Sequence, residues 1–305
     1  MEALLLEGYM LRRALRPLKE HFSVYLTDMN LGEVMHIRSG IGSYYADPFI
    51  WTTSDGTWLL VEKYDYAAEV GCLCAIRVDR GGRPSLEVGL PFAGHISFPF
   101  LFEDSGKLYM VPETCSERSV DLYECESFPA QWKYRSRILS GVDAADTVVF
   151  RHEGRWWLIT SVRDNPGEQR YLAIYSSQGL DGEWRAHPVN RERRYSDGKF
   201  GYGRNGGSIV YFNRQLLRMM QASELYYGQS LVVMEIKKLT LSEYAETEYG
   251  GSHPVKEISR RNSPHHISMH RGLIAFDIRD RINFLQHVQS LKRRTGLEAN
   301  PVQAC

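Results

Sequence analysis

Asp47-Pro-Phe-Ile-Trp51 is the first copy of a short phrase that recurs along this chain of 305 residues. Each copy consists of one variable residue, a largely apolar run, a polar turn and a second apolar run. The later copies, the last of them the weakest, are Phe98-Pro-Phe-Leu-Phe102, Asp146-Thr-Val-Val-Phe150, Gly207-Ser-Ile-Val-Tyr211 and His265-His-Ile-Ser-Met269. Repeats of about 40–50 residues built from short strands are typical of a β-propeller, in which each repeat forms one four-stranded blade. The phrase therefore predicts an all-β fold, a five-bladed β-propeller.

The segments around the phrase complete this prediction. Four repeats contain a third apolar run, and three of these continue through a turn into a fourth strand. Residues 22–26 and 33–37 read as strands before the first copy, so we expect this N-terminal segment to help close the ring. Residues 279–294 are amphipathic and predict a C-terminal helix, followed by a tail to residue 305. We expect one domain over residues 1–305, with the propeller at about residues 22–278.

Composition excludes several classes of function. Lys+Arg and Asp+Glu are both 37, so no net charge draws the chain to nucleic acid or to an anionic membrane. The five cysteines are odd in number and lack paired metal-ligand spacing, which favours reduced thiols in a cytoplasmic protein over zinc or a disulfide framework. No segment reads as a signal peptide or a membrane span. We predict no cofactor.

Three carboxylates stand out at the ends of inner strands. Asp47 and Asp146 open the first and third copies of the phrase, and Glu113 closes the second strand of the second repeat. Carboxylates around a partly desolvated pocket are what glycoside chemistry uses, one as acid and one as base or nucleophile. The alternative for Asp47 and Asp146 is a turn-capping role through backbone N–H groups. Glu62, at the corresponding place in the first repeat, is either a fourth member or only a strand-end residue.

Polar and aromatic residues near the same strand ends extend the candidate site. His265 and His266 open the fifth copy, and His95 precedes the second. Each is either a structural hydrogen bonder or a ligand for sugar hydroxyls or phosphate. A metal is a minor alternative, because their spacing matches no metal signature, and we predict none. Tyr44 and Tyr45 offer faces on which a sugar could stack.

Arg204 opens the fourth repeat in Arg204-Asn-Gly-Gly207, where the glycines allow close backbone approach to a ligand. A tight turn with a surface arginine is equally consistent with this stretch. The polar, glycine-rich segment 191–203 comes just before it. We expect that segment, with Tyr44 and Tyr45, to wall a concave polar pocket on the propeller axis.

Several phrases resemble a known family. They are His95-Ile-Ser-Phe-Pro-Phe-Leu-Phe-Glu103, Met110-Val-Pro-Glu113, Asp121-Leu-Tyr123, Phe128-Pro-Ala-Gln-Trp132, Asp146-Thr-Val-Val-Phe150, Tyr227-Gly-Gln-Ser-Leu231 and Glu235-Ile-Lys-Lys-Leu-Thr240. Together they resemble the propeller domain at the N-terminus of plant glucosamine inositolphosphorylceramide transferases, over roughly residues 40–275. More distantly, the chain is similar to the five-bladed superfamily of arabinanases, levansucrases and invertases.

That distant resemblance implies roles for individual residues. Asp47 matches the superfamily's base or nucleophile, and Asp146 matches the aspartate that orients substrate or tunes a pKa. The superfamily's acid is commonly a Glu near the start of blade four, where this chain has Arg204 instead. Glu113 is the candidate replacement.

Three hypotheses follow for function, the third of them a protein-interaction platform with no sugar role. The first is an enzyme, a glycoside hydrolase or glycosyltransferase that acts on a glycan or glycoconjugate in cell-surface polysaccharide metabolism. The second is a non-catalytic sugar-binding or scaffolding propeller that serves a partner enzyme of glycan biosynthesis. The two aspartates favour the enzyme, whereas the missing blade-four acid favours the binding module. The resemblance also implies that the plant proteins carry their transferase chemistry in another domain. We lean to the enzyme.

Overall fold

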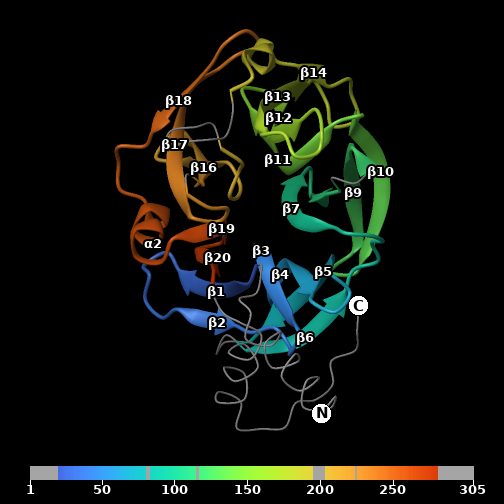
Figure 1. Cartoon of the computed structure of the whole chain (residues 1–305), viewed down its shortest axis with the longest axis vertical. Coiled ribbons are helices and arrows are strands. Elements are labelled where there is room, and N and C mark those ends of the chain that lie inside the picture. The colour runs from blue at the N-terminus through green and yellow to red at the C-terminus, as the bar shows by residue number, and fades with distance from the viewer. Residues whose placement is uncertain (1–19, 80–82, 115–116, 195–202, 224, 281–305) are drawn as a thin grey trace, which may run out of the picture.

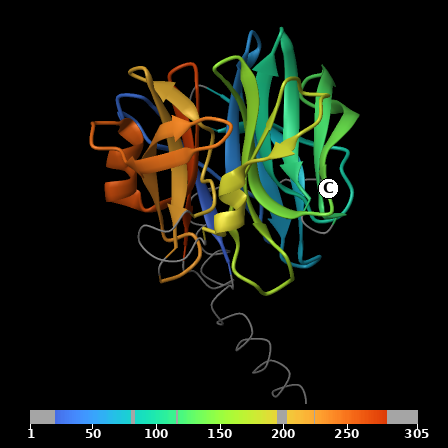
Figure 2. The same cartoon turned by 90° about the horizontal axis from the view of Figure 1, so that it is seen from above.

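The computed structural model describes residues 20–79, 83–114, 117–194, 203–223 and 225–280. These residues form five four-stranded antiparallel sheets, grouped around a common centre rather than stacked in layers (Figures 1 and 2). The first strands β3, β7, β11 and β19 lie nearest that centre in Figure 1. The predicted all-β fold with four-stranded sheets is confirmed.

Each sheet corresponds to one repeat. The first contains β3 (Ser43–Thr53), β4 (Gly56–Asp65), β5 (Val70–Val78) and β6 (Pro84–Gly89). The second contains β7 (Ser97–Asp104), β8 (Lys107–Glu113), β9 (Ser119–Ser127) and β10 (Gln131–Ser140). The third contains β11 (Asp143–His152), β12 (Arg155–Arg163), β13 (Tyr171–Ser177) and β14 (Arg185–Ala186). The fourth contains β15 (Val210–Phe212), β16 (Gln215–Ala222), β17 (Ser230–Leu239) and β18 (Tyr244–Glu248). Outside the strands lie the 3₁₀ helix η2 (Pro188–Glu192) and the helix α2 (Pro254–Asn262).

The fifth sheet joins the two ends of the described chain. Its order is β19 (Pro264–His270), β20 (Leu273–Arg279), β1 (Phe22–Asp28) and β2 (Met35–Ile37). Strand β1 pairs with β20 along its whole length, from Phe22 opposite Arg279 to Asp28 opposite Leu273. The prediction that the N-terminal segment helps to close the ring is therefore confirmed. The predicted helix over residues 279–294 lies almost wholly outside the described residues.

Apolar side chains fill the space between neighbouring sheets. Phe49 of β3 contacts Phe98 and Phe100 of β7 edge to face, with ring centroids 5.0 and 5.7 Å apart. Leu59, Leu60 and the other apolar residues in the middle of the second strands are buried. Burying a side chain of this size contributes about 1.5–3 kcal/mol. The packing holds the inner strands in place, so the ends of those strands become fixed points for a site.

Four of the inner strands, β3, β7, β11 and β19, are interrupted near their starts. The register shifts between Ala46 and Phe49, between Ser97 and Phe100, between Ala145 and Val148, and between Pro264 and His266. In the first three bulges Asp47, Phe98 and Asp146 take positive φ values of 49°, 45° and 51°. Bulges re-aim side chains, and a left-handed conformation at a residue other than glycine persists only where the surroundings hold it in place. The variable first residue of the phrase is thus the residue that leaves the strand.

Gly207 marks a close approach between the fourth and fifth sheets. It pairs with Ile267 across the seam and has a φ of 143°, and a Cβ at this position would lie 1.9 Å from the Ile267 carbonyl oxygen. We expect Gly207→Ala to lower the free energy of unfolding by about 1–3 kcal/mol, because the backbone must shift to admit the methyl group. Urea denaturation measures this. Gly40→Ala is the control, since nothing lies within 4 Å of its Cβ position, and an equal loss in both variants would contradict the seam argument.

Candidate active site

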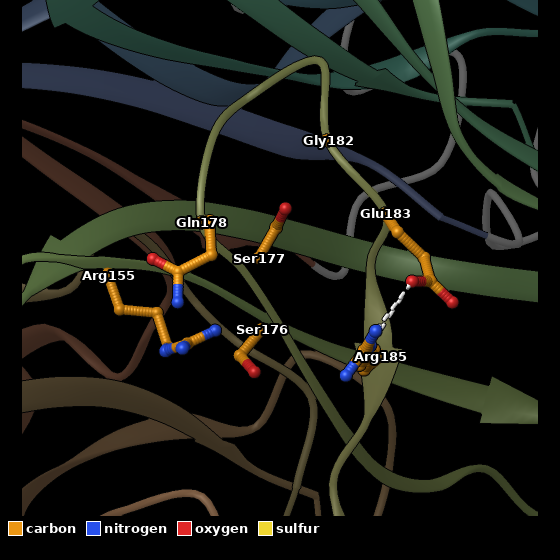
Figure 3. Close-up of a pocket in the computed structure, with 7 residues that line it drawn as sticks. All are labelled: Arg155, Ser176, Ser177, Gln178, Gly182, Glu183 and Arg185. Carbon is orange, nitrogen blue, oxygen red and sulfur yellow. Dashed lines mark hydrogen bonds and ion pairs between the residues drawn. The ribbon is translucent and has the colours of Figure 1, made fainter.

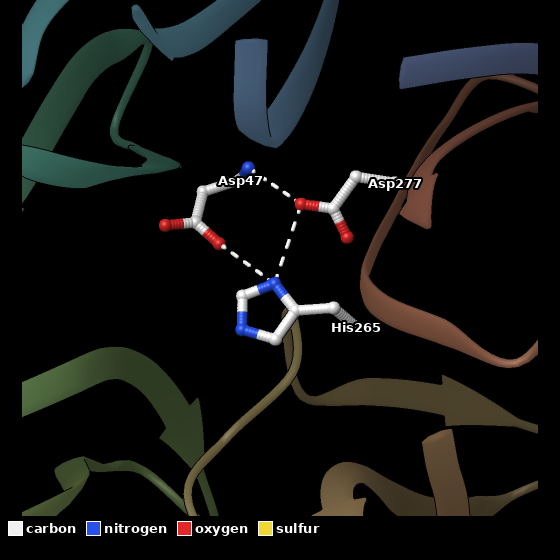
Figure 4. Close-up of side chains that lie close together, drawn as sticks. All are labelled: Asp47, His265 and Asp277. Carbon is white, nitrogen blue, oxygen red and sulfur yellow. Dashed lines mark hydrogen bonds and ion pairs between the residues drawn. The ribbon is translucent and has the colours of Figure 1, made fainter. Parts of the chain in front are cut away.

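The start of β19 brings a histidine between two carboxylates. His265 Nδ1 lies 3.3 Å from Asp277 Oδ2 and 3.6 Å from Asp47 Oδ1, as Figure 4 shows. Asp277 also accepts a hydrogen bond of 2.9 Å from the Asp47 backbone N–H, which the bulge in β3 leaves without a ladder partner. The second strand of one sheet thus supports the first strand of the next.

The same arrangement occurs between the second and third sheets. The backbone N–H of Asp146, in the bulge of β11, donates to Glu113 Oε2 at 2.8 Å. Arg204 forms a two-pronged ion pair with the Asp146 carboxylate, with Nη2 2.9 Å from Oδ1 and Nε bonded to Oδ2. Arg204 Nη2 lies 3.6 Å from Glu113 Oε2 as well. Glu113 therefore contacts both the backbone of Asp146 and its counter-ion.

Tyr227 connects these two groups. Its hydroxyl lies 2.8 Å from His265 Nε2, and the Arg204 guanidinium lies over its ring at 5.1 Å from the centroid. Asp146 and Glu113 lie close enough to Asp47 to raise its pKa, and His265 lies close enough to Asp146 to act in the lowering direction on the pKa of that group. We call this set the ion cluster; it consists of Asp47, Glu113, Asp146, Arg204, Tyr227, His265 and Asp277.

Burial sets the protonation of the carboxylates. Burial raises the pKa of Asp47 to about 8, against the opposing effect of His265 and with smaller contributions from Asp277, Asp146 and Glu113. Burial likewise raises the pKa of Asp146 to about 6, although Arg204 acts in the other direction. The pKa of Glu62, which is also buried, is raised well above its usual value by burial and then by the charge of Asp47. Asp47 therefore holds a proton at neutral pH, as a general acid must.

The two adjacent histidines differ in charge. Burial acts to lower the pKa of His265, but the Asp277 carboxylate and its hydrogen bond outweigh it, so the pKa is raised. Burial lowers the pKa of His266 to about 3. The His266 ring lies between Phe49 and Phe98, and neither ring nitrogen has a hydrogen-bond partner among the described residues. His265 thus joins the ion cluster, whereas His266 lies in an apolar contact between sheets.

Of the two tyrosines predicted from the sequence, one lies beside the ion cluster and one lies away from it. Tyr44 is buried in an aromatic group with Phe22, Tyr64, Tyr66 and Tyr227, next to the cluster. Tyr45 points to the other side of β3, as alternation along a strand requires, and its hydroxyl bonds to Glu87 on the outer strand β6. The structure does not bring Tyr45 to the cluster.

His95 is exposed, and its Nδ1 accepts a hydrogen bond of 2.9 Å from the Gly71 backbone at the start of β5. It supports a neighbouring strand and contacts no member of the ion cluster through a described hydrogen bond. Of the segment 191–203, which we expected to wall the pocket, residues 195–202 lie outside the described residues.

Sequence reasoning missed Asp277 and Tyr227 as site residues. Asp277 ends a predicted strand and looks like an ordinary strand-end residue, with no signal until β20 is placed beside β3. Tyr227 lies between β16 and β17 within Tyr227-Gly-Gln-Ser-Leu231, one of the phrases that carry the family resemblance. That phrase was the available signal.

One group among the described residues has the spacing of a cation site. Ligand atoms of Asp47, His265 and Asp277 lie within 4.8 Å of one another. A proton on His265 Nδ1, placed between two carboxylates, accounts for this geometry by itself. We therefore assign no metal here.

The structure also contains a pocket of about 200 Å³ at the opposite end of the third sheet (Figure 3). It is lined by Arg155, Ser176, Ser177, Gln178, Gly182, Glu183 and Arg185. Arg155 pairs with His152 at the hairpin end of β11, whereas Asp146 lies near the start of that strand. The pocket shares no residue with the ion cluster.

Fold and site together define a class of protein. It is an all-β repeat protein with a buried ion cluster at the starts of its inner strands. No helix within the described ranges is long and apolar enough to cross a membrane. The family described as glucosamine inositolphosphorylceramide transferase 1, N-terminal, matches residues 34–271. The chain belongs to this family.

Curated relatives agree with this assignment. The chain is 33% identical over 217 residues to glucosamine inositolphosphorylceramide transferase 1 of Arabidopsis thaliana, and this covers 69% of the chain and 28% of the relative. The namesake from Oryza sativa subsp. japonica is 31% identical over 208 residues, which covers 67% of the chain and 28% of the relative. The chain thus spans little more than a quarter of the length of the relatives it matches.

Solved structures with a similar backbone fold include two glycosidases. A GH43 β-1,3-galactosidase with galactodeoxynojirimycin has a TM-score of 0.49 and 12% identity, covering 70% of this chain and 77% of that one. The α-L-arabinanase of Cellvibrio cellulosa, complexed with arabinohexaose, has a TM-score of 0.48 and 11% identity, covering 67% and 77%. Neither likeness bears on substrate or mechanism.

Proposed function

We propose that the five sheets are the blades of a five-bladed propeller and that the ion cluster is the active site of a carbohydrate-active enzyme, a glycosidase or glycosyltransferase. The observation that carries this proposal is the meeting of Asp47, Asp146 and Glu113 with Arg204 and His265 at the starts of inner strands. Carboxylates of unlike protonation, placed together in a partly desolvated site, are what cleavage or transfer at a glycosidic bond needs.

The electrostatics supports a different division of roles from the one that the distant superfamily implies. Asp47, with a pKa raised to about 8 by burial, suits a proton source better than a base or nucleophile. Glu113 has a side chain 13% exposed, against 2% for Asp146, and is the candidate base or nucleophile. Asp146, paired with Arg204, is the candidate orienting group.

A non-catalytic sugar-binding or scaffolding role is the second candidate. Arg204 engages both oxygens of Asp146, as a structural ion pair would. The relatives named as transferases are also far longer than the matched segment. In this case the chain would serve a partner enzyme in a glycan pathway. Cell-surface polysaccharide metabolism and a cytoplasmic location are part of the proposal in either form.

The charge balance of the site favours a cationic sugar. Among the described residues, the carboxyl groups of Asp47, Glu62, Glu113, Asp146 and Asp277 face two cations, Arg204 and His265, and burial keeps Asp47 and Glu62 from ionising unless a cation offsets their charge. A ligand ammonium would offset the excess. The names of the curated relatives contain glucosamine, which carries such an ammonium.

We therefore expect glucosamine to bind at least about tenfold more tightly than N-acetylglucosamine, a difference of about 1.4 kcal/mol, because acetylation removes the charge and keeps the ring. Isothermal titration calorimetry at neutral pH and low salt measures both sugars, with glucose as the uncharged control. Equal affinity for all three sugars would refute the charge argument.

The enzyme and the binding module are separated by turnover. A panel of 2,4-dinitrophenyl glycosides carrying glucosamine, glucose, galactose or mannose, in both anomers, tests hydrolysis directly. A glycan array tests binding on the same protein. Turnover of one sugar supports the enzyme, glycan binding without turnover of any substrate leaves the binding module, and an empty array with no turnover contradicts both.

A further inference from the structure

The imidazole of His265 connects buried acids to a more accessible phenol. Its Nδ1 faces Asp277 at 3.3 Å and Asp47 at 3.6 Å, and its Nε2 faces the Tyr227 hydroxyl at 2.8 Å. Asp47 Oδ1 has no hydrogen-bond partner among the described residues and is directed at this ring. A chain of polar groups therefore runs from the carboxyl groups of Asp47 and Asp277, through the His265 imidazole, to the Tyr227 hydroxyl.

The phenol end of that chain is the most exposed. Asp277 and His265 are 0% and 2% exposed and Asp47 is 6% exposed, so a ligand has little access to any of them. Tyr227 is partly exposed and lies against Arg204, whose side chain is 22% exposed. Tyr227 is thus the member through which a proton from the buried end could reach a ligand.

Charged and titratable side chains from several elements surround the His265 ring. The charged or titratable groups that act on it are Asp47 on β3, Asp277 on β20, Arg204 before β15, Tyr227 before β17 and the adjacent His266. The Phe22 ring of β1 packs against the imidazole at 4.8 Å between centroids. The Asp277 carboxylate holds a proton on Nδ1, which leaves Nε2 to exchange its proton with the phenol.

We propose that Tyr227 is the proton donor to the departing oxygen of the ligand and that His265, held by Asp47 and Asp277, replaces the proton that Tyr227 gives up. This inference rests on the proposed enzymatic function and names its acid. Tyr227 belongs to the fourth repeat, the repeat in which Arg204 stands where the distant superfamily commonly has its acid. The same repeat would thus supply the acid from another position.

The step balances in protons and electrons. The bond between the anomeric carbon and the leaving oxygen breaks, and its electron pair stays on that oxygen, which takes the Tyr227 hydroxyl proton. The phenol oxygen takes the Nε2 proton of the imidazolium, which becomes a neutral ring with its Nδ1 proton in place. In hydrolysis, a water oxygen bonds to the anomeric carbon and passes a proton to the Glu113 carboxylate. Return of that proton through solvent to His265 restores the site.

Leaving-group dependence tests this role. A 2,4-dinitrophenolate departs without protonation, whereas an unsubstituted phenolate needs an acid. We expect Tyr227→Phe to lose about 100-fold or more in kcat/KM on the phenyl glycoside of the active sugar and only a few-fold on its 2,4-dinitrophenyl glycoside. Tyr226→Phe is the matched control, since Tyr226 is 39% exposed and its ring lies under the Arg279 guanidinium instead. The control should equal the wild type on both substrates.

Other outcomes overturn the proposal. Equal losses on both glycosides would indicate a structural role for Tyr227, and no loss on either would remove it from the reaction. Loss of wild-type activity in EDTA, with recovery on adding a divalent cation, would show that His265 Nδ1 holds a metal and not a proton.

A second measurement does not need a substrate. Nitrogen-15 NMR of the histidine rings, followed from about pH 5 to pH 9, should show a changed His265 titration in Tyr227→Phe and an unchanged one in Tyr226→Phe. If the wild type hydrolyses no glycoside, the proposed function fails while this measurement still tests the contact. An unchanged His265 titration in Tyr227→Phe would overturn the relay even if the protein proves to be an enzyme.

Discussion

Replacing Arg218 by methionine is expected to lower the free energy of unfolding by about 3–5 kcal/mol. Arg218 and Glu246 are both 0% exposed, and they form two charge-assisted bonds of 2.6 and 2.8 Å. Arg218 also donates to the Gly203 carbonyl and to Asn205 Oδ1. Methionine would leave the Glu246 carboxylate buried without its counter-ion. Urea denaturation at neutral pH measures the loss.

The double variant Arg218→Met/Glu246→Leu separates the charge from the packing. Since it removes both charges, it should be clearly more stable than the single variant. The ion pair of Arg185 with Glu183 is the exposed control, with side chains 77% and 73% exposed, and Arg185→Met should cost less than about 1 kcal/mol. A double variant no more stable than Arg218→Met would contradict the argument.

Asp47→Asn is expected to have the largest effect on activity, a loss of about 10²–10⁴-fold in kcat with sugar binding retained. Asparagine keeps the shape of the side chain but has no ionisable proton, and the proposed function makes Asp47 the buried proton source of the site. Steady-state turnover of a phenyl glycoside and calorimetric titration of the sugar measure the two properties separately. Unchanged turnover would remove Asp47 from the proton path.

The pH dependence provides an independent check. Because burial raises the pKa of Asp47 from 3.8 to about 8, wild-type activity that depends on its proton should fall above about pH 8. The same pKa shift also makes stability depend on pH. The folded state loses stability as the pH rises from about 4 to about 8, because the unfolded chain ionises Asp47 in this range and the folded protein does not until about pH 8. Asp47→Asn lacks this loss. Its Tm relative to wild type should therefore rise between about pH 5 and pH 8, and a constant difference would contradict the raised pKa.

Much of the fold could be predicted from the recurring phrase. An apolar run, a turn with glycine and a second apolar run are local signals, and they located the inner hairpins such as β3–β4 and β11–β12. The N-terminal strands were predicted from composition, and β1 indeed pairs with β20. The bulges could not be predicted, because Asp47 and Asp146 hold their positive φ where their backbone N–H groups donate to carboxylates of neighbouring sheets.

The site was predictable mainly where a residue opened a repeat, and Glu113, at the end of a second strand, was the exception. Asp47, Asp146, His265 and Arg204 share that position, and the structure brings them together. Asp277 and Tyr227 come from a second strand and from a loop, so only the closed arrangement of sheets reveals them. Tyr45 was misplaced for a simpler reason: neighbours on a strand face opposite sides, and only one of Tyr44 and Tyr45 could face the cluster.

The pairing of β1 with β20 also determines when the site comes into existence. Residues 22–28 leave the ribosome early and must wait for residues 273–279 before their sheet can form. His265 and Asp277 belong to this last sheet, and Asp47 rests on it through its backbone N–H. A chain that is truncated or still being synthesised therefore has solvated carboxylates and no imidazole between them. Ring formation and the appearance of the proton path are a single event, and any activity of this cluster would report that the chain has been made and folded as far as β20.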